Sequence, residues 1–290
     1  MNRNSMNRIE LSSHAKINLR LDILRKRADG YHDIRTVFQK VSLRDELEIT
    51  ISKRGIKVTC DNPKVPANED NLAYRAAKAI LNRYKVKDGV SIVIKKNIPV
   101  AAGLGGGSSN AASTLLGINQ LFGLGVSKTE LMQIGKAIGA DVPFFIFGET
   151  ALATGIGDVL ETIEMTPELW LLLITPDIPI STAWAYNSLR MGLTNKHINT
   201  TIPSCINHLS EIITLLSNDL EKVAIPRYPI IQKIKDELIN KGAKGSLMSG
   251  SGSTVFGIFK SEDEAREAYT QLKTHSDWQV HLSHTIIVLE

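Results

Sequence analysis

The sequence predicts a mixed α/β protein (α/β or α+β), in which strands and helices follow one another along the chain. Stretches that alternate in the manner of a β-strand stand at 9–24, 45–52 and 89–96. Apolar residues at helical spacing lie between and after these stretches. The 290 residues are enough for one large or two ordinary domains. We place the division near residue 160.

The composition is globular and excludes several functional classes. Hydrophobic residues make up 43% of the chain, and 34 basic against 30 acidic side chains leave a net charge of +4 without a basic stripe, which argues against a nucleic-acid partner. Cys60 and Cys205 belong to no metal or redox motif, as is typical of a reducing compartment. No stretch approaches the roughly 18 apolar residues of a membrane span. We therefore expect a cytoplasmic protein without a membrane partner, either a monomer or a homodimer.

A glycine-rich cluster, VAAGLGGGSSNAAS at 100–113, stands between a strand-like and a helix-like segment. Consecutive backbone N–H groups in such a turn, followed by a helix N-terminus, can bind phosphate because no Cβ is in the way. A flexible linker has the same composition, but the position between two regular elements favours the phosphate cradle. Two common phosphate motifs do not fit, since no lysine follows Gly107 and Ser108 takes the place of the last glycine of a dinucleotide motif.

Capping residues set the expected helix bounds in the first half. Asn68 or Asp70 is the expected N-cap of a helix that includes 72–80. The helix after the glycine cluster is expected to begin near 108–110.

A further helix is expected after Ser127, which forms a capping-box pattern with Glu130. Gly139 is expected to end it in the left-handed conformation. The rest of the chain predicts a hairpin at 149–163 and a glycine-serine loop at 249–252. We expect strands at 168–176 and 278–289, and helices at 182–190, 205–220, 227–241 and 262–272, the last capped by Ser261.

Asp141 and Lys16 are candidate acid–base residues. Asp141 follows an expected helix end and precedes an apolar run, where a partly desolvated carboxylate suits a general base. A turn or capping role explains the same placement. Lys16 interrupts a strand-like run and shares its face with Asn18, although an exposed lysine on a half-solvated strand fits as well.

Two loops are candidate ligand contacts. Tyr31 and His32 follow an Asp-Gly turn, where an aromatic ring and an imidazole can stack on a planar ligand or pack on a neighbouring strand. The loop from Ser249 to Gly252 could approach phosphate, or it could let two backbones pack closely.

Four segments in this order resemble the GHMP small-molecule kinases: AKINLRLDILRKRADGYHDIRTVFQ, PVAAGLGGGSSNAAS, GADVPFFIFGETALATGIGD and GSLMSGSGSTVFGIF, together spanning 15–259. The resemblance implies a two-domain GHMP kinase fold. Residues 1–160 would form an ATP-binding domain with a left-handed βαβ unit, and residues 161–290 a ferredoxin-like domain on the substrate side.

The resemblance further implies an ATP-dependent kinase, assisted by Mg²⁺, with an alcohol as acceptor. The implied substrate is a small cytidine diphosphate compound, diphosphocytidyl methylerythritol, phosphorylated on its 2-hydroxyl in the non-mevalonate isoprenoid pathway. Two alternatives remain open: another GHMP kinase of the homoserine, mevalonate or galactose type, and a nucleotide-binding module without catalysis.

The resemblance also implies roles for individual residues. Lys16 and Asp141 become the catalytic pair. Asn18, Tyr31 and His32 hold the cytidine end together with a second aromatic ring, for which we choose Tyr186, with Trp184 as the competitor. No carboxylate cluster for a metal is apparent, and Ser108 is a candidate ligand of Mg²⁺. No function is predicted for 191–201. The nucleotide-binding residues are Asn71, Pro99, Val100, Ala101, Ala102, Gly103, Leu104, Gly105, Gly106, Gly107, Ser108 and Ser109.

Overall fold

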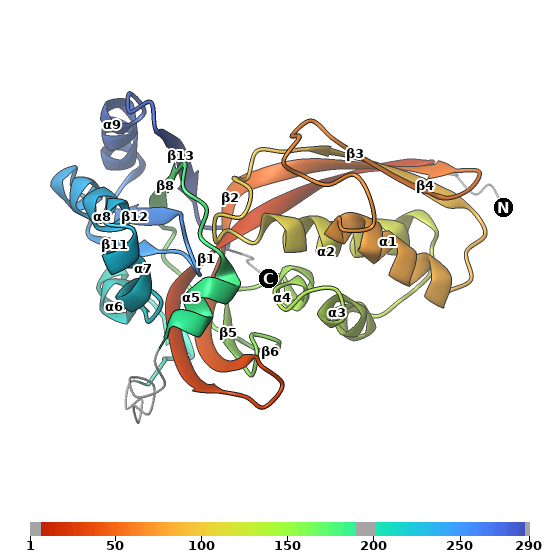
Figure 1. The fold of residues 1–290 in the computed structure, drawn as a ribbon, viewed down its shortest axis with the longest axis horizontal. Helices are drawn as coiled ribbons and strands as arrows, with labels where there is room; N and C mark the ends of the chain where they lie inside the picture. Colours follow the sequence, from red (N-terminus) through yellow and green to blue (C-terminus); the bar gives the residue numbers. More distant parts are fainter. Residues whose placement is uncertain (1–6, 190–200, 288–290) are drawn as a thin grey trace. The chain divides into compact units, whose positions relative to one another are not determined.

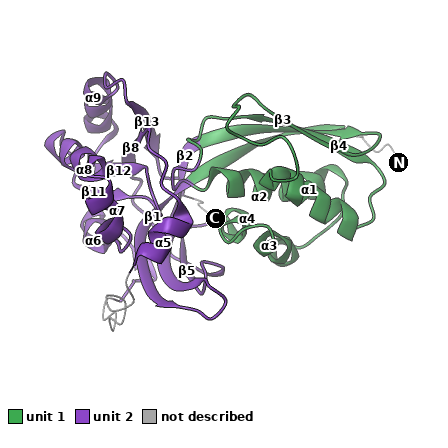
Figure 2. Ribbon diagram, viewed as in Figure 1, with its two compact units in different colours: residues 1–15, 44–100, 105–148 green, residues 16–43, 101–104, 149–290 purple. Residues whose placement is uncertain are grey.

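Two long strands, β1 (Arg8–Lys26) and β2 (His32–Ser52), dominate the first part of the chain in the computed structural model (Figure 1). The structure describes residues 7–189 and 201–287, so most of the segment 191–201 and the end of the expected last strand lie outside the described residues. Contacts divide the chain into two units (Figure 2): residues 1–15, 44–100 and 105–148 form unit 1, and residues 16–43, 101–104 and 149–290 form unit 2. Both strands contribute to both units.

Unit 1 is a sheet with helices along one face (Figure 1). The end of β2 pairs antiparallel with β4 (Gly89–Lys95), and β4 pairs parallel with β3 (Ile56–Cys60). The helices are α1 (Leu72–Arg83), α2 (Gly106–Leu121), α3 (Lys128–Lys136) and α4 (Val142–Phe147). The packing of α2 on the sheet is close, because a Cβ at Gly117 would lie 2.8 Å from Ile49 Cδ1. The segments β3, α1 and β4 form a parallel βαβ unit, whose left-handed crossover stays a prediction.

Unit 2 contains the ferredoxin-like arrangement. Its four-stranded antiparallel sheet has the order β11-β12-β8-β13. The chain order β8, α8, β11, β12, α9, β13 is the βαββαβ succession of that fold. Apolar residues of the strands and helices, including Leu172, Leu238 and Leu272, form one buried cluster. The elements are β8 (Trp170–Pro176), α8 (Ile230–Asn240), β11 (Gly245–Met248), β12 (Val255–Phe259), α9 (Glu262–Leu272) and β13 (Trp278–His284).

Short elements complete unit 2. The expected hairpin is formed by β5 (Ala151–Thr154) and β6 (Val159–Thr162), and β5 pairs with β2 at Phe38↔Ala151. β10 (Ser217–Asn218) runs parallel to β1 at Leu21↔Asn218. The remaining elements are β7 (Glu164–Met165), α5 (Thr182–Ser188), β9 (Cys205–Ile206), α6 (Leu209–Leu215) and α7 (Glu221–Arg227).

Three expected helix bounds in the first half are wrong. The N-cap of α1 is Asn71, whose side chain accepts a hydrogen bond from Ala73 N, and neither Asn68 nor Asp70. The helix α2 begins at Gly106, before the expected 108–110, because Gly105 adopts the left-handed conformation and caps it.

Gly139 does not end α3 in the left-handed conformation. The helix ends at Lys136, and both Ile138 N and Gly139 N donate to Gly135 O. Gly139 O then accepts from Val142 N at 3.1 Å, so the chain turns directly into α4 without a left-handed residue.

The stretch 205–220 is not one helix. It contains β9, α6 and β10, because pairing with other strands competes with the helical pattern at both ends. The contiguous domain division near residue 160 stays a prediction, and the contact-based units are a different partition, in which 16–43 belongs with the C-terminal part of the chain.

Candidate functional site

The glycine cluster opens α2 in unit 1. Gly105 has φ +70°, a conformation that a residue with a Cβ rarely adopts. The first helical hydrogen bond runs from Ser109 N to Gly105 O at 2.9 Å, so the N–H groups of Gly106, Gly107 and Ser108 precede the intrahelical ladder. Gly107 is exposed, and the first turn carries no acidic side chain. These N–H groups and the positive end of the helix dipole suit an anion.

A fully buried carboxylate, Asp45, fixes the segment that leads into the cluster. One oxygen accepts from the backbone N–H groups of Asn97 and Ile98, both at 2.8 Å. The other accepts from Asn110 Nδ2 at 2.9 Å and pairs with the Lys96 ammonium. Asp45 therefore joins β2, the residues before the glycines and the first turns of α2.

The ion pair between Lys96 and Asp45 also explains why Gly106 has no side chain. A Cβ at Gly106 would lie 2.7 Å from Lys96 Nζ and 3.1 Å from Ile98 Cγ2. A side chain at this position would push the Lys96 ammonium away from Asp45 or shift Ile98, so the ion pair favours glycine at the start of α2. The sequence patterns did not identify Asp45, Lys96 or Asn110.

The first half of the cluster, 101–104, belongs to unit 2 and packs against the second glycine-serine loop. Gly103 has φ +80°, and a Cβ there would collide with Ser249 O. Ser249 Oγ donates to Gly103 O at 3.0 Å, and Thr254 N donates to Ala102 O at 3.2 Å. Of the two functions considered for 249–252, the close packing of two backbones is confirmed.

Lys16 is buried in unit 2 and held by a chain of hydrogen bonds. Its backbone N–H donates to Leu104 O at 3.0 Å, which places it beside the glycine segment. Its Nζ donates to Asn18 Oδ1 at 2.6 Å, and Asn18 Nδ2 donates to Thr36 Oγ1 at 2.8 Å. A Cβ at Gly250 would lie 3.3 Å from Lys16 Nζ. The expectation of an exposed lysine is therefore wrong.

Asp141 occupies the N-cap position of α4 in unit 1. Its side chain makes no capping hydrogen bond, so the capping explanation fails. The residue is half-buried, at the end of the turn that begins with Gly139. A Cβ at Gly139 would lie 3.6 Å from Ser108 Oγ, which brings this turn next to the first turn of α2.

His32 and Tyr186 lie together in unit 2. Their ring centroids are 5.3 Å apart at an interplanar angle of 41°. Trp184, the competing aromatic residue, instead forms an edge contact with Tyr228 at 5.4 Å. Burial lowers the pKa of His32, and the charge of Lys26 lowers it further, so its imidazole is neutral at neutral pH. Tyr31 is 59% exposed at the turn.

Asn71 has a structural role that the sequence did not predict. Its Oδ1 accepts from Ala73 N at 2.8 Å, and its Nδ2 donates to Pro66 O at 2.7 Å. The side chain thus fixes the start of α1 against the preceding loop. A direct contact with a nucleotide stays a prediction.

Comparisons with known proteins find matches in both the N-terminal and the C-terminal part of the chain. The family model described as "GHMP kinases N terminal domain" matches 71–149, and "GHMP kinases C terminal" matches 202–277. A protein of Geobacter metallireducens named 4-diphosphocytidyl-2-C-methyl-D-erythritol kinase is 52% identical over 276 residues, covering 95% of this chain and 98% of its own. The chain belongs to the GHMP kinases. A relative of the same name from Geobacter sulfurreducens is 49% identical over 93% of the chain and 97% of its own.

Solved structures agree with this membership of the GHMP kinases. A crystal structure of 4-(cytidine 5'-diphospho)-2C-methyl-D-erythritol kinase matches with a TM-score of 0.80 and 32% identity, covering 96% of this chain and all of the other. A homoserine kinase from Cytophaga hutchinsonii has a TM-score of 0.74 at 17% identity over 99% of this chain and 97% of its own, which shows a shared fold. The expected two-domain GHMP kinase fold is confirmed.

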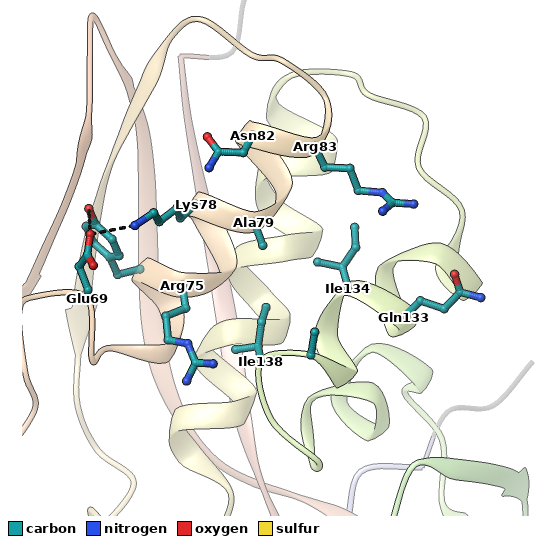
Figure 3. Close-up of a pocket in the computed structure, with 11 residues that line it drawn as sticks. Glu69, Arg75, Lys78, Ala79, Asn82, Arg83, Gln133, Ile134 and Ile138 are labelled. Carbon is teal, nitrogen blue, oxygen red and sulfur yellow. Dashed lines mark hydrogen bonds and ion pairs between the residues drawn. The ribbon is translucent and has the colours of Figure 1, made fainter.

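A pocket of about 620 Å³ lies between α1 and α3 of this GHMP kinase (Figure 3). None of the residues predicted for the site lines it. The lining residues are Glu69, Tyr74, Arg75, Lys78, Ala79, Asn82, Arg83, Gln133, Ile134, Ala137 and Ile138.

Within 7–189 and 201–287, no three His, Cys, Asp or Glu side chains are grouped so that they could hold a metal ion. No helix in this described part of the GHMP kinase is both long and apolar enough to span a membrane.

Proposed function

We propose that this GHMP kinase transfers the γ-phosphoryl group of ATP to the 2-hydroxyl of 4-diphosphocytidyl-2-C-methyl-D-erythritol, a step of non-mevalonate isoprenoid precursor synthesis. The observation that carries the proposal is 52% identity to a kinase of that name over 95% of the chain. Mevalonate and homoserine kinases share the fold, but at 17% identity or less they support no substrate assignment. A cytoplasmic location for this reaction stays a prediction.

Asp141 and Lys16 are the proposed catalytic residues. Asp141 would accept or orient the proton of the substrate hydroxyl as a general base. The turn that ends at Asp141 lies next to the first turn of α2, where a Cβ at Gly139 would lie 3.6 Å from Ser108 Oγ, and this position supports the role. Lys16 would favour the anionic form of Asp141 and stabilise negative charge that develops during transfer. Its burial and its hydrogen bond to Asn18 support a fixed position for the ammonium.

The start of α2 is the proposed binding site of the ATP phosphates. The N–H groups of Gly106, Gly107 and Ser108 precede the helical ladder and fit an oxyanion. ATP would supply the transferred phosphoryl group, with Mg²⁺ neutralising charge on its phosphates. The described residues contain no carboxylate cluster for the metal, so the phosphates and Ser108 would hold it.

The cytidine end of the substrate is assigned to the turn before β2 and to α5. The neighbouring rings of His32 and Tyr186 support Tyr186 as the second aromatic residue. The exposed ring of Tyr31 would stack on the base. A lowered pKa keeps the His32 imidazole neutral, so it can both donate and accept a hydrogen bond.

A substrate panel tests the function. The purified chain is incubated with ATP, Mg²⁺ and one of 4-diphosphocytidyl-2-C-methyl-D-erythritol, mevalonate or homoserine, and products are followed by ³¹P NMR. We expect a new phosphate monoester with the cytidylyl compound only. A preference for mevalonate or homoserine would contradict the proposed substrate, and ATP binding without any product would indicate a non-catalytic module.

A further inference from the structure

The pocket between α1 and α3 has an apolar floor and a basic rim (Figure 3). Its apolar lining residues are Ala79, Ile134, Ala137 and Ile138. Three basic residues and one acidic residue line the walls, so the charge of the pocket is positive. These charged residues are Arg75, Lys78, Arg83 and Glu69.

Two of the three cations are engaged in ion pairs. Lys78 Nζ lies 2.9 Å from Glu69 Oε1, and Arg83 Nη2 lies 2.8 Å from Glu130 Oε1. Arg75 is exposed, and within 7–189 and 201–287 its guanidinium forms neither an ion pair nor a side-chain hydrogen bond. Arg75 is therefore the lining cation whose charge the described residues leave without a carboxylate.

The two segments that line the pocket, α1 and the end of α3 with the turn that follows it, both have a residue next to the first turn of α2. Leu72 lies one helical turn before Arg75 on the same face of α1, and its Cδ1 lies 3.4 Å from the position of a Cβ at Gly107. On the other wall, Ile138 is followed by Gly139, where a Cβ would lie 3.6 Å from Ser108 Oγ. Arg75 thus stands on the helix face that borders the first turn of α2.

The glycine-rich segment from Pro99 to Ser109 also contains no positively charged side chain. No lysine or arginine occurs from Pro99 to Ser109, and Lys96, just before it, pairs with Asp45. Backbone N–H groups and a helix dipole carry only fractional positive charge, whereas the phosphates carry several negative charges. A full positive charge next to this turn would compensate for part of that difference.

We propose that Arg75 is a phosphate-binding residue that extends the cradle at the start of α2 into the pocket between α1 and α3. Its planar guanidinium can donate two parallel hydrogen bonds to one phosphate group. The phosphate belongs to ATP if the proposed function holds, on which this assignment rests. Otherwise it is a free inorganic phosphate or pyrophosphate.

The test compares R75A and R75K with K78A and R83A, which remove ion-paired cations of the same pocket. Calorimetry measures the Kd of ADP, of adenosine and of inorganic pyrophosphate. For R75A we expect the Kd of ADP to rise about ten- to a hundredfold. The Kd of adenosine should not change, because adenosine has no phosphate. R75K should lie between the wild type and R75A, since lysine keeps the charge but loses the planar fork. K78A and R83A should match the wild type.

Several outcomes would overturn the assignment. In the first, R75A binds ADP with the Kd of the wild type. In the second, R75A loses as much affinity for adenosine as for ADP. In the third, K78A and R83A lose as much affinity for ADP as R75A does. If the wild type binds pyrophosphate but neither ADP nor adenosine, the proposed function fails. Arg75 is then still a phosphate-binding residue only if R75A has lost its affinity for pyrophosphate. If the wild type binds none of the three, both proposals fail.

Discussion

The ammonium group of Lys16 donates a 2.6 Å hydrogen bond to Asn18 Oδ1, two residues along the same strand. Both side chains are buried, and Asn18 is itself fixed by its hydrogen bond to Thr36. The amide of Asn18 thus orients the proposed catalytic lysine, as well as being a predicted substrate contact.

Replacing Asn18 should therefore reduce catalysis. In N18A the Lys16 ammonium loses a charge-assisted hydrogen bond of about 1.5–3 kcal/mol, so we expect kcat to fall about ten- to a hundredfold. Steady-state kinetics measure this change. T36A removes the bonds from Asn18 Nδ2 to Thr36 Oγ1 and from Thr36 Oγ1 to Arg20 O, but it keeps the bond between Lys16 and Asn18, so it should have a smaller effect on kcat. A kcat in N18A equal to that of the wild type would show that Asn18 does not position Lys16.

Removing the Asp45 carboxylate should strongly destabilise unit 1. In D45N the Lys96 ammonium stays buried without its counter-charge, and loss of one partner of a buried pair costs about 3–5 kcal/mol. Urea denaturation measures the free energy of unfolding. The control is D88N, which alters an exposed aspartate of the same unit and should change stability by less than about 0.5 kcal/mol. Equal stabilities of D45N and D88N would contradict this account.

Gly103 and Gly123 form a matched pair for alanine substitution. Both have positive φ, +80° and +59°, but a Cβ at Gly103 would meet Ser249 O, whereas nothing lies within 4 Å of one at Gly123. G123A should lose about 1–2 kcal/mol for the left-handed backbone. G103A should lose about 1–3 kcal/mol more, because the two loops must separate. Similar unfolding midpoints in urea would show that the loops do not pack as described.

His32 should make stability depend on pH. Its pKa in the folded protein lies below the ordinary value of 6.5 because burial and Lys26 disfavour the charged ring. Between the folded pKa and 6.5, the unfolded state binds more protons, so stability falls as the pH drops through this range. Urea midpoints from pH 8 to 5 should therefore decrease more for the wild type than for H32N. His281, whose pKa is also lowered by burial, is present in both proteins and cancels. Parallel curves would contradict the lowered pKa of His32.

Local patterns predicted much of the fold. The Ser127 and Ser261 N-caps and the hairpin at 149–163 are confirmed, because each depends on residues close in sequence. The prediction of one helix at 205–220 is wrong, because β10 exists only by pairing with β1, nearly 200 residues away. Propensity within a window contains no information about such a partner.

The candidate site was predictable only in part. The glycine cluster and Lys16 became candidates from their places in regular patterns, and the resemblance to the GHMP kinases then implied their roles. Asp45 was missed because a carboxylate in a strand normally indicates an exposed position, and only the fold brings Lys96 and Asn110 to it. Tyr186 was chosen over Trp184 from the resemblance alone, and the ring contact between His32 and Tyr186 that supports this choice is not specified by the sequence.

The central claim is that Lys16 and Asp141 carry out phosphoryl transfer. The most direct measurement is the single-turnover rate of K16A and D141N with saturating ATP and 4-diphosphocytidyl-2-C-methyl-D-erythritol, with folding checked by circular dichroism. The account predicts that both folded variants transfer phosphate at least about a hundredfold more slowly than the wild type. Rates equal to that of the wild type in both folded variants would contradict it.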